Sequence, residues 1–265
     1  MKMEKTTAPV SDIQAYLNRI GYHGPLDGSA ETLAALQEAH VKSVPYENLD
    51  ILMGVPLSLE IPDLFRKIVK NHRGGYCFEL NGLFAWLLEC LGYPVHQYMS
   101  RFLRDETAIP MRRHRVLKVE AEGIFWLCDV GVGGPSPCRP LQMEAGLEQH
   151  QGNEAYRLKQ DPFLGWVVEE FRRDAWMQYY SFTEEPQLPL DYVMPSYWCE
   201  HAPESVFTKA GMISIRTQAG RNTVAGDEFR IFTGQGARVF VPESEEERMN
   251  ALRTCFGIDL EAGKQ

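Results

Sequence analysis

Arg73-Gly74-Gly75-Tyr76-Cys77-Phe78-Glu79-Leu80-Asn81 joins a glycine-rich turn to the start of an amphipathic helix. The apolar residues that follow recur with helical spacing, at positions 80, 83, 84, 87, 88 and 91. Gly92 stands where a helix C-cap belongs, and Pro94 prevents continuation. The pattern therefore predicts a buried helix that carries Cys77 in its first turn.

The position of Cys77 suits a nucleophile. Unpaired N–H groups and the positive end of the helix dipole favour a thiolate over a thiol at that point. The alternative is structural, because free cysteine is commonly a small buried residue and would fit a tight turn behind two glycines. The choice between a nucleophilic and a structural role therefore depends on which other residues accompany Cys77.

Composition narrows the class of protein. The chain has 265 residues, 44% of them hydrophobic, which is enough for one large domain or a few small ones. Its net charge of −9 argues against nonspecific binding to nucleic acid or to an anionic membrane. Residues 1–10 lack an apolar signal core, and no apolar run approaches the ~20 residues of a membrane span. We expect a cytoplasmic protein.

The six cysteines give no sign of a disulfide framework or a metal site. Disulfides are not expected in a cytoplasmic protein. No C-x-x-C pair occurs, and no His/Cys group has zinc-site spacing. We expect no metal.

The order of expected elements favours an α+β fold. Residues 1–93 read as helical, with Ser11 and Ser29 as caps and Pro62 opening a third helix. An antiparallel sheet or barrel is expected next, from segments rich in β-branched and aromatic residues: 95–103, 115–121, 124–130, 166–171 and 176–182. A mixed tail follows, with strands expected at 212–217, 228–232 and 238–241. Its last helix opens with a capping box in which Ser244 and Glu247 exchange backbone bonds. Helices first and strands second indicate α+β rather than a wound parallel sheet.

His114 and Asp129 are candidate partners of Cys77. Of seven histidines, only His114 heads a strand of an evident hairpin, and Asp129 lies in an apolar string where an unpaired carboxylate is costly. The two side chains are directly opposite if residues 120–123 form the loop, and diagonal if the loop is Glu122-Gly123; a three-residue loop would separate them. Alternatively, His114 is a surface residue among the basic residues 112, 113 and 115, and Asp129 a turn residue.

In these motifs the chain resembles the arylamine N-acetyltransferases over nearly its full length. The matching segments are 16–22, 44–51, 73–81, 129–134 and 205–208, with His114 between them. The resemblance implies a helical domain (1–93), a β-barrel domain (94–190) and an α/β lid (191–265), built around a cysteine-protease-like catalytic core. It also implies a triad of Cys77, His114 and Asp129.

The implied activity is transfer of an acetyl group from acetyl-CoA, the acyl-donor substrate, to the nitrogen of an arylamine or hydrazine, as in xenobiotic metabolism. Two half-reactions through acetyl-Cys77 predict ping-pong kinetics. The resemblance places Gly131, Gly133, Gly134 and Thr217 near the cofactor. We expect a monomer or weak homo-oligomer with small-molecule partners only.

The amine pocket departs from the family pattern. Family members often carry an aromatic residue where this chain has Val132, and valine offers no aromatic face. We therefore expect a wider or less ring-selective pocket, to which Phe78 also contributes. Glu47 and Arg73 are expected to form a bidentate pair that holds the start of the nucleophile helix.

Three other functions fit the same residues. An amide synthase of the same family would close a tethered polyketide amine. A hydrolase or a transglutaminase-like enzyme would use the same Cys–His–Asp order. A hydrolase would release its product without any amine. A noncatalytic binding protein would carry an incidental cysteine.

Overall fold

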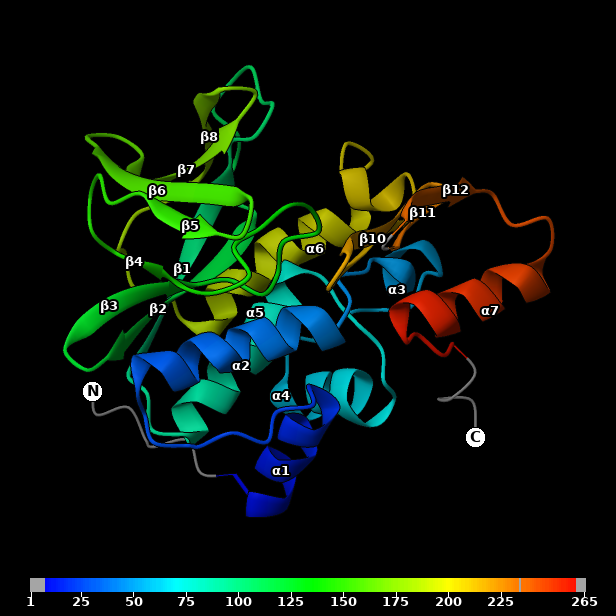
Figure 1. Ribbon diagram of the computed structural model, residues 1–265, viewed down its shortest axis with the longest axis horizontal. Helices are drawn as coiled ribbons and strands as arrows, with labels where there is room; N and C mark the ends of the chain where they lie inside the picture. Colours follow the sequence, from blue (N-terminus) through cyan, green and yellow to red (C-terminus); the bar gives the residue numbers. More distant parts are fainter. Residues whose placement is uncertain (1–7, 234, 261–265) are drawn as a thin grey trace.

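The computed structural model describes residues 8–233 and 235–260. Its first part is helical, and the segments are α1 (Val10–Arg19), α2 (Ala30–Ser43), α3 (Leu49–Leu52), α4 (Ile61–Leu64), the π-helix η1 (Phe65–Lys70) and α5 (Cys77–Cys90). Helix α5 is almost wholly buried, from Cys77 through Leu88. Figure 1 shows α5 at the centre of the molecule, with α2 beside it.

An eight-stranded antiparallel sheet follows, in the order β4-β3-β2-β1-β8-β7-β6-β5. Its strands are β1 (Val95–Phe102), β2 (His114–Ala121), β3 (Ile124–Cys128), β4 (Leu141–Gln142), β5 (Gln149–Gln151), β6 (Glu154–Asp161), β7 (Gly165–Arg172) and β8 (Ala175–Phe182). The sheet curls until its two edges meet: the side chain of Gln149 accepts from the Gln142 amide at 2.8 Å and donates to its carbonyl at 3.0 Å. Gln151 forms the same two bonds with the Arg139 backbone, so two side chains replace the backbone ladder that would close the barrel.

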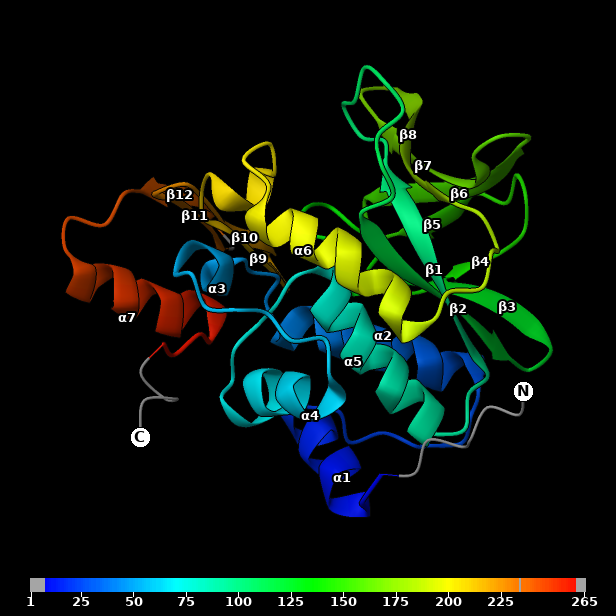
Figure 2. The same ribbon diagram turned by 180° about the vertical axis from the view of Figure 1, so that it is seen from behind.

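The last part packs against both others. Its elements are η2 (Pro189–Tyr192), α6 (Val193–His201), η3 (Val206–Thr208), β9 (Met212–Thr217), β10 (Gly220–Ala225), β11 (Glu228–Thr233), β12 (Gly236–Phe240) and α7 (Glu245–Phe256). Figure 2 shows α6 running along α5, and Tyr192, Cys199 and Phe207 belong to the same buried core as α5. The expected boundary near residue 190 therefore does not divide the core.

The α+β class is confirmed, and most expected elements lie where the sequence placed them. Ser29 caps α2 by accepting from the Thr32 amide at 3.1 Å. The capping box of α7 differs from expectation: Ser244 accepts from the Glu247 amide, but Glu247 accepts from the Glu243 amide at 2.8 Å. Strands β4, β5, β6 and β10 were not expected; β6 and β10 alternate polar with buried residues. No described helix has the length and apolar character to cross a membrane.

Candidate active site

The turn before α5 leaves Cys77 as the first residue of the helix. At Gly74 a side chain would collide with the Pro45 carbonyl, so only glycine fits. Beyond it, the carboxylate of Glu79 accepts from the Tyr76 amide at 3.1 Å and satisfies a donor at the helix start. The thiol of Cys77 points back to the Arg113 carbonyl, 3.8 Å from Sγ. The glycines and the glutamate therefore fix where the sulfur lies.

His114 and Asp129 meet across the β2–β3 hairpin. Ala121 pairs with Ile124, so the loop is Glu122-Gly123. Both loop residues have positive φ, 54° and 75°, as the tight hairpin turn requires. In this register the two side chains are diagonal neighbours, and His114 Nε2 lies 2.7 Å from Asp129 Oδ2. Of the loop lengths considered, the structure has the two-residue one.

Asn81, one turn after Cys77, ties the nucleophile helix to this pair. Its Nδ2 donates to Asp129 Oδ1 at 2.8 Å, and its Oδ1 accepts from the Val130 amide at 2.9 Å. The Gly131 amide also donates to Asp129 Oδ1 at 2.9 Å. No role was expected for Asn81 from the sequence. The signal for Asn81 was a polar residue between Leu80 and Leu83 on a largely apolar helix, where it is costly to bury unless it is bonded.

Cys77 and His114 border one cavity of about 340 Å³. Its walls are largely apolar or backbone, with three charged side chains at Arg104, Glu106 and Arg113. The loop after β3 lies directly over the cysteine, because a Cβ at Gly131 would come within 2.7 Å of Cys77 Cα. Because Cys77 lines the cavity, a small ligand can reach the residue from this side.

Burial controls the charge state of the sulfur. Burial, together with the nearby Cys199 and Asp129, raises the pKa of the Cys77 thiol well above its usual range, although backbone N–H groups oppose this. The sequence-based expectation that the helix start alone favours a thiolate is therefore outweighed. A thiolate at Cys77 needs a base beside it, and His114 borders the same cavity.

The other expected site residues are distributed unevenly. Gly131, Val132, Gly133 and Gly134 all line the cavity. Phe78 does not: it is fully buried, with its ring between those of Tyr76 and Tyr192. Thr217 lines a separate hollow of about 390 Å³. The binding roles of all six residues remain predictions.

The basic residues around His114 have three different settings. Arg113 lines the cavity and pairs with Glu106 at 3.3 Å. Arg112 pairs with Glu185 away from it. Arg115 is buried, and its guanidinium donates to the Phe78 carbonyl at 3.1 Å. Of the three, only Arg113 is placed to meet an anion in the cavity.

Arg73 and Glu47 form the expected pair, with a third member. Arg73 Nε and Nη2 both reach Glu47 Oε1, at 2.9 and 2.8 Å, and Nη2 also reaches Asp50 Oδ1 at 2.8 Å. The contact is therefore shared rather than a two-oxygen fork. In the described part of the chain, no three His, Cys, Asp or Glu side chains gather as metal ligands.

A family model described as N-acetyltransferase matches residues 29–265. Curated relatives include the arylamine N-acetyltransferases of Mycobacterium tuberculosis, 33% identical over 94% of this chain and 90% of the relative, and of Mycolicibacterium smegmatis, 34% identical over 94% and 92%. The chain belongs to the arylamine N-acetyltransferase family.

Solved structures of arylamine N-acetyltransferases agree with this fold. The Salmonella typhimurium enzyme superposes with a TM-score of 0.88, at 30% identity, over 94% of this chain and 91% of that one. The Mycobacterium marinum enzyme in complex with CoA gives 0.86, at 33% identity, over 95% and 94%. Helices, a nearly closed barrel and a final sheet with a helix are thus shared with other arylamine N-acetyltransferases.

Proposed function

We propose that this chain transfers an acetyl group from acetyl-CoA to the nitrogen of arylamines or arylhydrazines, through an acetyl-Cys77 intermediate. The observation that supports it most is the arrangement of three side chains. Cys77 and His114 border one cavity, and His114 is hydrogen-bonded to the buried Asp129. Members of the same family that share a third of the sequence are named for this activity.

In the first half-reaction, His114 acts as the base. Because Asp129 accepts from Nε2–H, Nδ1 is the nitrogen left to take the thiol proton. The thiolate attacks the thioester carbonyl, the bond to the CoA sulfur breaks, and the imidazolium returns its proton to that sulfur. Asp129 stabilises the imidazolium, which offsets the burial that opposes ionisation of Cys77.

In the second half-reaction, the amine takes the place of CoA. Its nitrogen attacks the acetyl-Cys77 carbonyl, His114 accepts the amine proton, and the C–S bond breaks to restore the thiolate–imidazolium pair. The cavity suits an aromatic acceptor, because its walls include the side chains of Phe102, Phe207 and Met212. Val132 lines this cavity at a position where an aromatic side chain would make the cavity narrower.

Initial-rate kinetics with acetyl-CoA and an aromatic amine test this proposal. A ping-pong mechanism gives parallel double-reciprocal lines. Release of free acetate at the same rate without any amine would indicate a hydrolase instead. Intersecting lines would indicate direct transfer without an acyl-enzyme.

A further inference from the structure

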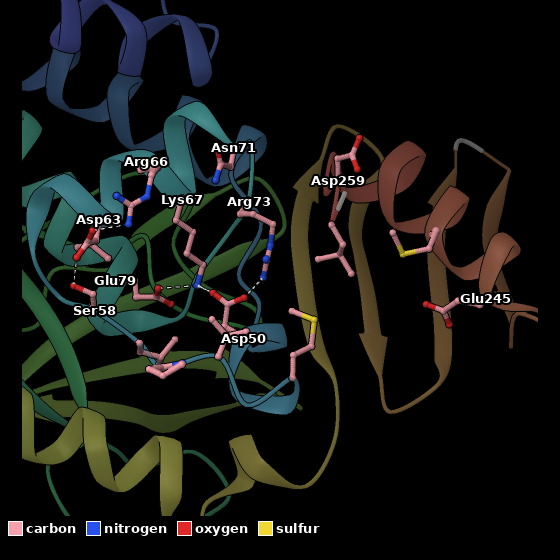
Figure 3. Close-up of a pocket in the computed structure, with 17 residues that line it drawn as sticks. Asp50, Ser58, Asp63, Arg66, Lys67, Asn71, Arg73, Glu79, Glu245 and Asp259 are labelled. Atoms are coloured by element: carbon pink, nitrogen blue, oxygen red, sulfur yellow. Dashed lines mark hydrogen bonds and ion pairs between the residues drawn. The ribbon is translucent and has the colours of Figure 1, made fainter. Parts of the chain in front are cut away.

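A second cavity, of about 790 Å³, lies outside the candidate active site. It shares no lining residue with the cavity that contains Cys77. Figure 3 shows it between two walls: one is formed by the helical part of the molecule, with Asp50, Lys67 and Arg73, and the other by α7 and the residues after it, with Glu245 and Asp259. Nothing in the proposed reaction uses this space.

The cations of this cavity are already engaged. Lys67 Nζ lies 2.7 Å from both Asp50 Oδ2 and Glu79 Oε1. Arg73 is held by Glu47 and Asp50, and Arg66 pairs with Asp63 at 2.6 Å. An anionic ligand would compete with these carboxylates for the cations. The cavity is therefore unfavourable for binding an anion.

Negative charge, by contrast, is in excess. Among the described residues, five carboxylates and three basic side chains line the cavity: Asp50, Asp63, Glu79, Glu245 and Asp259 against Arg66, Lys67 and Arg73. Asp259 also pairs with Arg253, at 3.3 Å. Within the described ranges, no hydrogen bond or ion pair reaches the exposed carboxylate of Glu245. A cation that enters the cavity gains this field without displacing a partner.

The same cavity has apolar surface for a ligand body. Met53 and Val55 are half exposed on the helical side. Met249 lies one helical turn after Glu245, on the same face of α7, and Leu260 also lines the cavity. Methionine adapts to many shapes and contacts aromatic rings favourably. Exposed carboxylate and thioether thus stand side by side on one wall.

We propose that this cavity is a second binding site, which takes an organic cation with an apolar or aromatic body. The positive head lies toward Glu245, and the body lies against Met53 and Met249. The site does not depend on the proposed acetyl transfer. Its floor is the charge network that ends at Glu79, whose carboxylate holds the amide before Cys77, so an occupant contacts groups that support the nucleophile helix.

Isothermal titration with benzyltrimethylammonium tests the proposal on the full chain. This probe has no N–H bond and so cannot be acetylated. Phenylacetate serves as the matched anion. We expect one benzyltrimethylammonium site, no phenylacetate binding at the same concentrations, and unchanged binding after iodoacetamide has alkylated Cys77.

Matched variants of α7 locate the probe. Glu245→Gln should weaken binding about three- to fivefold, the size expected for one exposed charge pair, whereas Glu246→Gln should not. Met249→Lys should abolish binding, whereas Asn250→Lys should leave it intact. Thermal melting of each variant confirms folding.

Three results would overturn the proposal. They are no binding of the cation, equal binding by the Glu245 and Glu246 variants, and loss of binding when Cys77 is alkylated. The last result would place the probe in the active-site cavity instead. None of them bears on acetyl transfer, which the kinetics test separately.

Discussion

The segment from Arg73 to Asn81 is held from two sides, and the two sides differ in kind. Toward α3 and η1, its Arg73 and Glu79 meet Lys67, Asp50 and Glu47 in a network of ion pairs. Toward β2 and β3, its Cys77 and Asn81 meet His114 and Asp129. The first side consists of fixed charges, and the second contains a group that can gain and lose a proton.

The two cations of this network, Lys67 and Arg73, keep their charge over any working pH. Burial would lower the pKa of Lys67, but the carboxylates of Glu79, Glu47 and Asp50 raise it above its usual range. Glu47 and Asp50 raise the pKa of Arg73 in the same way. Such groups cannot exchange protons with a substrate. The ion-pair network around Lys67 and Arg73 is therefore expected to stabilise the fold. The His114–Asp129 pair is expected to take part in the reaction.

Asp129→Asn tests the chemical side and should have the largest effect. An amide in place of the carboxylate favours the wrong tautomer of His114 and cannot stabilise its cation, so kcat/KM should fall about 10³- to 10⁴-fold. Asp174→Asn, in an exposed turn that tolerates asparagine, is the control. A near-normal rate for a folded Asp129→Asn enzyme would contradict the assignment of His114 as base.

Lys67→Met tests the supporting side. Removing the ammonium leaves Asp50 and Glu79 without their shared partner, and the unfolding free energy should drop by about 3–5 kcal/mol, measured by chemical denaturation. Lys70→Met, at an exposed position of the same π-helix, should change it little. Equal stability of the two variants would mean that the network is not structural.

The pH dependence of the unfolding free energy tests the ion pairs of Asp50. Burial opposes ionisation of Asp50, but Lys67 and Arg73 lower its pKa below the usual value. A lowered folded-state pKa contributes stability above the unfolded pKa, about 4, and this contribution disappears as the pH falls further. The difference in unfolding free energy between wild type and Asp50→Asn should therefore narrow below about pH 4. A constant difference would contradict the ion-pair account.

Val132→Phe should have the smallest effect. A ring at this cavity wall adds an aromatic face, and kcat/KM for an aromatic amine relative to a hydrazine should rise about two- to tenfold. Val132→Leu, which adds volume without a ring, is the control. An unchanged preference would show that position 132 does not contact the acceptor.

Local patterns in the sequence predicted the nucleophile helix and the hairpin. The helical spacing after Leu80 and the turn at Glu122-Gly123 are short-range features, so α5, β2 and β3 could be placed and the His114–Asp129 pair anticipated. Strand β6 was missed because its lysine, glutamine and acidic residues alternate with few apolar ones. Its strand conformation depends on pairing with β5 and β7, because its own residues show no clear strand pattern.

Long-range contacts account for what the sequence left open. Asp50 joins the Arg73–Glu47 pair only because α3 folds back beside η1. Cys77 is a first-turn residue, as expected, yet the depth of its burial reverses the expected direction of its pKa. That depth comes from packing of the barrel and of α6 over α5, at residues distant in the sequence.

Acyl transfer through one sulfur is the central step of the proposed function, and mass spectrometry tests it most directly. After incubation with acetyl-CoA alone, the peptide that contains Cys77 should gain one acetyl group, and an added aromatic amine should remove it. Unmodified Cys77, or an acetyl group on another cysteine that the amine discharges, would contradict the account.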